Sequence, residues 1–220
     1  MASIVLLDDN FRTIVRAIAE GRQLFRNLKL SFAFLLMVHM PLMATAAFIP
    51  FAGFPLLYLP LHIVWLELII HPVALLVFQE LPPLDELESV WRNPKVRFFD
   101  WREWTLIAIV GVLVSAIIVV GYVRSLGIDQ DVEHARTMAL IALIMAFAAI
   151  TAALSRFRSR NAVVAVVAMV TSAGILSQIP SIASLLHLRP LHFDDWLLAG
   201  CSGLAAGALA ILLPWMARRQ

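Results

Sequence analysis

Two ionisable side chains, Glu67 and His71, stand inside the apolar stretch "IVWLELIIHPVALLVF" that runs from Ile63 to Phe78. They are four residues apart, so on a helix they share one face. A carboxylate oxygen and an imidazole nitrogen on one face can bind a cation together or pass a proton between them. This pair of ligand types suits Mn, Zn, Fe, Co or Ni better than Na or K. The spacing therefore predicts a site for a cation or a proton.

A third ionisable residue, His39, lies in another apolar stretch, in the tetrapeptide "VHMP" that ends at Pro41. His71 is likewise next to a proline, Pro72, in "IIHP". Proline frees a backbone carbonyl one turn earlier in a helix. Such carbonyls are tolerated in a membrane only where protein or a water-filled cavity receives them, and transporters use broken helices to coordinate ions. We predict that His39, Glu67 and His71 form a cation or proton site, with helix unwinding at Pro41 and Pro72.

The same residues have an alternative interpretation. Polar side chains in a membrane protein often hydrogen-bond to a neighbouring helix and only hold the bundle together. Three ionisable residues beside two prolines favour a cavity over simple packing, because ionisable groups within a span are costly and indicate function by default.

The composition predicts that these residues are positioned by membrane helices. The chain of 220 residues is 61% hydrophobic, has a mean hydropathy of +0.88 and has only 15% charged residues. Soluble domains are closer to half apolar, so this balance is typical of a membrane protein. The basic residues form no single surface, which argues against a nucleic-acid partner. The single cysteine, Cys201, makes neither an internal disulfide nor a metal cluster.

A membrane-spanning helix needs about 20 mostly apolar residues. Six stretches meet this need, so the predicted fold is an all-α membrane protein with six transmembrane helices. The predicted spans are Leu30–Phe51, Pro55–Phe78, Trp104–Val123, Thr137–Leu154, Ala162–Ile179 and Trp196–Met216.

The basic residues predict the orientation of these spans. Fourteen of the 17 Lys and Arg residues fall before the first span, in alternate connections and at the C-terminus. The other three connections contain only Arg124, Arg136 and Arg189. Because basic loops stay on the cytoplasmic side, we expect a multi-pass protein of the cell membrane with both termini in the cytoplasm.

The first 29 residues differ from the spans. In "DDNFRTIVRAIAEGRQLFRNLK", apolar residues recur at helical spacing and polar ones fall on the other side. No proline separates this amphipathic helix from the first span, so we expect one long helix that leaves the bilayer as a stalk. The alternative is a helix lying on the membrane surface.

The stretch "ASIVLLDDNFRTIVRAIAEGRQLFRNLK" resembles the segment of P-type cation-transporting ATPases that leaves the phosphorylation domain and enters the fifth membrane helix. In that family it typically reads "AD.VL.DDNF..IV.A..EGR....N.K". The sixth helix of the family is similar to the segment from "LPLHIVWLEL" to "ELPP", in which "WLELIIHP" takes the place of "W.NL..D". The resemblance implies that the chain covers the last six of ten membrane helices together with the stalk.

The resemblance also implies a division into parts. Residues 1–29 would be a cytoplasmic stalk after the phosphorylation domain, residues 30–216 the six-helix transport domain, and residues 217–220 a cytoplasmic tail. The sequence has no "DKTG", "TGES" or "GDG.ND" motif. We therefore expect a piece of a longer pump that binds no cofactor and hydrolyses no ATP alone, whereas the full-length pump would use ATP and Mg. Its expected partners are the lipid bilayer, the transported cation and the remaining parts of the pump.

The candidate site departs from the pattern of the calcium and sodium pumps. At the positions where that pattern has amides and carboxylates, this chain has His39 and Leu42, then Glu67, Ile70 and His71. Two imidazoles argue against Ca, Na or K and favour a transition metal or a proton. Besides a pump domain, the chain has two alternative functions. The first is a self-standing protein that acts as a passive or secondary ion carrier or as an interaction subunit. The second is a structural helix bundle without transport.

Overall fold

The structure is a computed structural model that describes residues 11–81 and 98–212. Its helices are α1 (Phe11–Phe51), α2 (Pro60–Pro72), the π-helix η1 (Val73–Val77), α3 (Trp101–Asp129), α4 (Val132–Ser155), α5 (Arg160–Gln178), α6 (Pro180–Leu185), α7 (Phe193–Ala208) and the 3₁₀-helix η2 (Leu209–Ile211). These described residues contain no strand, so the prediction of an all-α membrane protein is confirmed.

Five of the described helices are long and apolar enough to cross a membrane: α1, α2 together with η1, α3, α4 and α5. They coincide with the first five predicted spans. The last predicted span, Trp196–Met216, falls on α7 and η2 and extends past the described residues. A sixth span therefore stays a prediction, as does the cytoplasmic tail at residues 217–220, which lies outside the described part of the chain.

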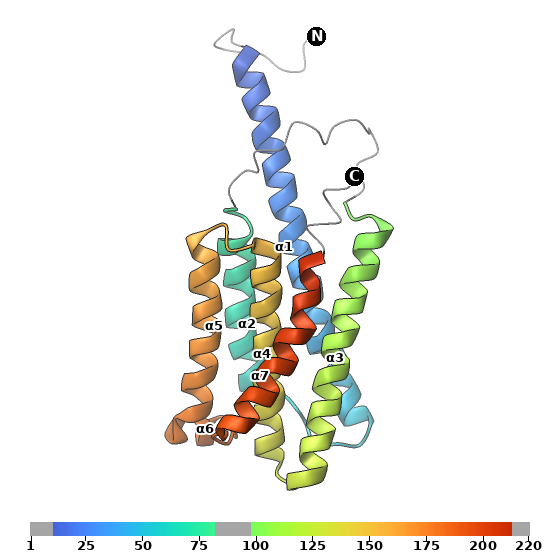
Figure 1. The fold of residues 1–220 in the computed structure, drawn as a ribbon, viewed down its shortest axis with the longest axis vertical. Helices are drawn as coiled ribbons and strands as arrows, with labels where there is room; N and C mark the ends of the chain where they lie inside the picture. The colour runs from blue at the N-terminus through green and yellow to red at the C-terminus, as the bar shows by residue number, and fades with distance from the viewer. Residues whose placement is uncertain (1–10, 82–97, 213–220) are drawn as a thin grey trace.

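Helix α4 forms the centre of the bundle, with the other helices around it (Figure 1). Most of α4 is buried, whereas less than half of each other candidate span is. Apolar residues occur all around α4, which is typical of a helix with neighbours on every side. In Figure 1, α7 runs obliquely across the bundle, and its closest partner is α4.

Helix α1 continues without interruption from the predicted stalk into the first span. Its 41 residues correspond to a length of about 60 Å, roughly twice the thickness of the hydrocarbon core. Its N-terminal part extends beyond the other helices (Figure 1). This course favours a stalk over a helix lying across the membrane surface. The first ten residues of the predicted stalk lie outside the described residues.

An ion pair fixes the base of this stalk to the start of α3. Lys29 Nζ lies 2.7 Å from Glu103 Oε1, and the Glu103 side chain is completely buried. The other carboxylate oxygen of Glu103 accepts a hydrogen bond from the backbone N–H of Asp100, at 2.8 Å, within the capping box of α3. Lys29 also lies 5.7 Å from the centre of the Phe99 ring. The charged groups are therefore well compensated, as buried ions must be.

Polar side chains of α1 also hold the end of the second span. Ser31 Oγ donates a hydrogen bond to the carbonyl of Ala74, at 3.0 Å, within η1. One turn earlier on α1, the Asn27 amide donates to the carbonyls of Gln79 and Leu81, each at 3.0 Å. The carbonyls of Gln79 and Leu81 follow the end of η1, where the helical hydrogen-bond pattern stops, and the Asn27 side chain provides them with a donor.

The two prolines of the candidate site affect their helices differently. At Pro72 the α-helix ends, and the next five residues form the π-helix η1, because proline cannot donate to the carbonyl of Leu68. Helix α1, by contrast, continues through Pro41. Thr45 Oγ1 donates to the carbonyl of Pro41 at 2.7 Å. In this structure α1 is therefore not unwound at Pro41, whereas at Pro72 the α-helix α2 gives way to the π-helix η1.

Two loops meet at the end of the bundle opposite the stalk, and a buried histidine joins them. His62 Nδ1 accepts a hydrogen bond from the backbone N–H of Leu59, at 3.2 Å. Its proton must then lie on Nε2, which donates to the carbonyl of Leu186 at 2.7 Å. His62 is fully buried. It is therefore a neutral structural residue that connects the start of α2 to the end of α6.

The buried Arg136 reinforces the same junction. Its Nη2 and Nε donate to the carbonyls of Leu56 and Leu57, at 2.9 and 3.1 Å. Its Nη1 donates to the carbonyl of His187 at 3.2 Å. Arg136, one of the three basic residues in the connections with few positive charges, thus links two loops from a buried position.

We expect His62→Ala to lower the free energy of unfolding by about 2 kcal/mol, because it leaves the Leu186 carbonyl and the Leu59 N–H without partners in a buried place. Unfolding of the purified chain by denaturant in detergent micelles measures the change. His62→Gln is the control, since its amide can both donate and accept. Equal stability of the alanine variant and the unchanged chain would contradict the structural role.

Candidate functional site

The structure brings all three predicted site residues together. His39 lies on α1, whereas Glu67 and His71 lie one turn apart on α2. His39 Nε2 is 3.5 Å from Glu67 Oε1, and His71 Nδ1 is 3.0 Å from Glu67 Oε2. The two imidazole rings are 6.2 Å apart between centres and nearly perpendicular. Glu67 thus stands between two histidines and presents one oxygen to each.

The His39 ring is oriented by its own helix. Its Nδ1 lies 2.9 Å from the carbonyl of Leu35, one turn earlier on α1. A carbonyl only accepts, so Nδ1 carries a proton and donates it. In the neutral ring, Nε2 is then an acceptor, and it faces Glu67 Oε1, which in a carboxylate is an acceptor too. Two acceptors in contact repel each other unless a cation lies between them or one of them is protonated.

The second oxygen of Glu67 is also unusual. Glu67 Oε2 is buried and makes no hydrogen bond within the described residues. His71 Nδ1 lies 3.0 Å away, but it is also 3.2 Å from the backbone carbonyl of Glu67, which is its hydrogen-bond partner. Since the backbone carbonyl only accepts, His71 Nδ1 carries a proton, and at 3.0 Å it is the ion-pair partner of Glu67 Oε2 when the imidazole is charged.

The three side chains do not form a finished metal cage. Within residues 11–81 and 98–212, no group of three or more His, Cys, Asp or Glu side chains is arranged to hold a metal ion. The reason is that the imidazoles approach different oxygens of Glu67, so the nitrogens do not converge on one point. Metal–ligand distances of about 2.0–2.2 Å would require the side chains to move.

The site is open on one side. The side chain of Glu67 is 31% exposed and that of His71 is 64% exposed. Neighbouring apolar residues of α2, Val64 and Leu68, are exposed as well. Within the described part of the chain, therefore, no helix covers this face of α2.

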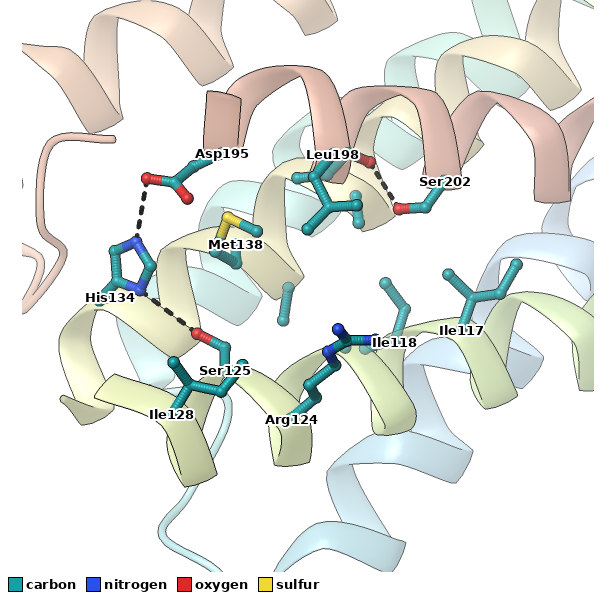
Figure 2. A pocket seen from close by; sticks show the side chains of 14 residues that line it. Ile117, Ile118, Arg124, Ser125, Ile128, His134, Met138, Asp195, Leu198 and Ser202 are labelled. Carbon is teal, nitrogen blue, oxygen red and sulfur yellow. Dashed lines mark hydrogen bonds and ion pairs between the residues drawn. The ribbon is translucent and has the colours of Figure 1, made fainter. Parts of the chain in front are cut away.

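A second polar cluster, which the sequence did not indicate, lies between α3, α4 and α7 (Figure 2). His134 Nε2 is 3.2 Å from Asp195 Oδ2, and His134 Nδ1 is 3.3 Å from Ser125 Oγ. The three residues come from three helices, and 61 residues separate His134 from Asp195. No spacing rule connects such positions, so only the packing of the helices could show the cluster.

These observations define the class of the protein: an α-helical membrane protein with a carboxylate between two imidazoles inside its spans. Residues 55–218 match the sequence profile of the family described as "Cation transporting ATPase, C-terminus". The chain therefore belongs to this family and corresponds to the C-terminal membrane region of a P-type ATPase.

Two curated relatives agree with this assignment. The chain is 25% identical to a calcium-transporting ATPase of Bacillus subtilis (strain 168), over 95% of this chain and 25% of the relative. It is 28% identical to calcium-transporting ATPase 1 of Bacillus cereus (strain ATCC 10987 / NRS 248), over 89% of this chain and 25% of the relative. The chain thus spans about a quarter of the length of the curated relatives that it matches.

Proposed function

We propose that this chain carries part of the cation translocation site of a P-type ATPase and that His39, Glu67 and His71 bind the transported species. The observation that carries the proposal is the contact between His39 Nε2 and Glu67 Oε1 at 3.5 Å, while His39 Nδ1 already donates to Leu35. Two facing acceptors repel each other unless a proton or a metal ion lies between them. A proton satisfies the contact as it stands, and a metal ion would draw the two atoms closer.

The chemistry of the three side chains indicates which kind of cation the site would bind. Calcium takes six to eight oxygen ligands, whereas the three side chains here offer one carboxylate and two imidazoles. Imidazole with carboxylate suits a transition metal, and both groups can also carry a proton. Although the two relatives are named calcium-transporting ATPases, we propose a proton or a transition metal as the cargo of this site.

The open face of the site fits a larger assembly. Glu67 and His71 are partly exposed on a face of α2 that no described helix covers. We propose that the rest of the pump packs there, adds the remaining ligands, and supplies the ATP and Mg chemistry that drives transport. The predicted orientation then places the stalk end of α1 in the cytoplasm of a cell whose plasma membrane holds the pump.

The direct test is a titration of the purified chain in detergent with Zn, Mn and Co, and with Ca and Na for comparison. We expect the transition metals to release protons into a weakly buffered solution and to raise the thermal unfolding temperature, because metal and proton compete for the same atoms. Proton release by Ca alone would refute the proposed donor set, whereas release by none of the ions would exclude the transition metals and leave the proton as the cargo.

The alternative, a passive or secondary carrier, makes a different prediction. A carrier would produce ion flux across liposomes that contain only this chain and no ATP. We expect no such flux, because the proposed site is only part of a path. Flux that disappears on Glu67→Gln would replace our proposal with the carrier.

A further inference from the structure

A cavity of about 260 Å³ lies between α3, α4 and α7, away from the candidate cation site. Figure 2 shows Arg124 of α3 and Leu198 of α7 reaching into the space between their helices. The cavity exists because α7 crosses the bundle obliquely and packs mainly on α4, so the start of α7 leaves room beside α3 (Figure 1).

The lining of the cavity changes from polar to apolar along the helices. The polar residues lie at one end of the bundle: Arg124 and Ser125 near the end of α3, His134 at the start of α4 and Asp195 at the start of α7. The deeper residues are apolar, among them Ile117, Ile118 and Leu198. Ser202, the deep polar residue, donates its hydrogen bond to the carbonyl of Ala199 in its own helix.

This polarity gradient matches the depth of a bilayer. The 29 residues of α3 correspond to about 43 Å, which exceeds the hydrocarbon thickness of about 30 Å. With α3 centred in the bilayer, Arg124 therefore lies at the boundary between the acyl chains and the lipid headgroups, within reach of a phosphate. The apolar part of the cavity then lies at the level of the acyl chains.

The polar end of the lining contains one cation, Arg124, one carboxylate, Asp195, and the imidazole of His134. The Asp195 carboxylate is compensated by His134 and by the backbone N–H of His192, at 3.2 Å each, at the N-terminal end of α7. Arg124 makes no ion pair with any side chain that the structure describes. An arginine at a membrane interface beside a compensated carboxylate attracts an anion, and its planar guanidinium suits phosphate.

From these observations we infer that the cavity between α3, α4 and α7 binds one anionic phospholipid, with its phosphate at Arg124 and the start of one acyl chain between Ile118 and Leu198. The volume is too small for a whole lipid, so the rest of the molecule remains in the bilayer. Such a lipid would fill the gap between α3 and α7 and stabilise the bundle by binding its folded form.

Two variants of α3 test the inference without altering charge. A Cβ added at Gly121, which lines the cavity, meets no atom within 4 Å, so Gly121→Leu fills the space without a backbone clash. A Cβ at Gly127 also meets nothing within 4 Å, but Gly127 does not line the cavity. Gly127→Leu is therefore the matched control. A second pair, Arg124→Gln and Arg160→Gln, removes one positive charge either at the cavity or at the start of α5.

The experiment uses the delipidated 220-residue chain in neutral detergent, with dioleoyl phosphatidylglycerol or dioleoyl phosphatidylcholine at equal mole fraction. Native mass spectrometry measures retained lipid, and the thermal unfolding temperature measures stabilisation. We expect one retained phosphatidylglycerol, retention about fivefold weaker in Arg124→Gln, and none in Gly121→Leu. The two control variants should behave like the unchanged chain.

Three results would overturn the inference. The first is equal retention of phosphatidylglycerol by Gly121→Leu and Gly127→Leu. The second is equal retention of the two lipids by the unchanged chain. The third is the same stabilisation by inorganic phosphate alone, which would mean that Arg124 binds an ion and not a lipid. If Gly121→Leu fails to fold, the arginine pair alone decides, because both of its members are exposed on the surface.

Discussion

Replacing Glu67 with Gln should weaken metal binding and metal-linked proton release by more than about tenfold without lowering the stability of the chain. The amide removes the negative charge that a cation needs. It can also donate a hydrogen bond to His39 Nε2, the acceptor that now lies 3.5 Å from Glu67 Oε1. Glutamine therefore satisfies the contact without any cation, and we expect the free energy of unfolding to stay within about 1 kcal/mol of the original.

This combination distinguishes a cation site from simple packing. If Glu67 only held α1 and α2 together through His39 and His71, metals would have no effect on either protein, and the glutamine variant would differ from the original in stability alone. The matched control is Glu20→Gln, which removes the same charge from the exposed stalk, where Glu20 pairs with Arg16 at 2.9 Å. Calorimetric titration with Zn and denaturant unfolding, performed on all three proteins, provide the two measurements.

The second large effect is expected at Gly203 on α7. A Cβ built there would overlap the carbonyl oxygen of Ala142 on α4 and would lie 2.9 Å from the Ala142 carbonyl carbon. Four residues later, a Cβ at Gly207 would lie 2.7 Å from the Cβ of Ala149. Small residues at this spacing allow two membrane helices to approach closely enough for backbone contact. Gly203→Ala should therefore destabilise the chain by about 3 kcal/mol, since α7 must move away from α4.

The control for Gly203→Ala is Gly174→Ala, which we expect to stabilise the chain and not to destabilise it. A Cβ at Gly174, in the interior of α5, meets no atom within 4 Å. Gly174→Ala should raise the free energy of unfolding by about 0.5–1 kcal/mol, because alanine loses less backbone entropy in a helix than glycine does. Unfolding in detergent micelles measures both variants. A stabilising effect at Gly203 would show that α7 does not approach α4 as closely as the structure has it.

The sequence predicted the architecture well because its main determinant is local. An apolar run of about 20 residues must form a helix in a membrane, whatever surrounds it. The first five spans were therefore found with small errors at their ends. The second span was placed too early, since residues 54–59 form a loop, held by Arg136, before α2 begins at Pro60. The packing of the loops, which decides such a boundary, has no signature in the apolar pattern.

The candidate site shows the same division between local and tertiary information. The spacing of Glu67 and His71 on one helix was sufficient to place them together, because a helix fixes the positions of residues four apart. His39 lies on another helix, and only the structure shows that its Nε2 is 3.5 Å from Glu67 Oε1. Binding of a cation by these residues stays a proposal.

The sequence by itself determined that the chain is helical, lies in a membrane and has ionisable groups inside its spans, because hydropathy and helical spacing are properties of neighbouring residues. The tertiary structure alone decided which polar groups meet across helices. It made His62 a structural residue, joined Ser125, His134 and Asp195, and opened a cavity beside Arg124. The physical reason is that these contacts depend on crossing angles and close approaches, such as that of Gly203 to Ala142, which arise only when the helices pack together.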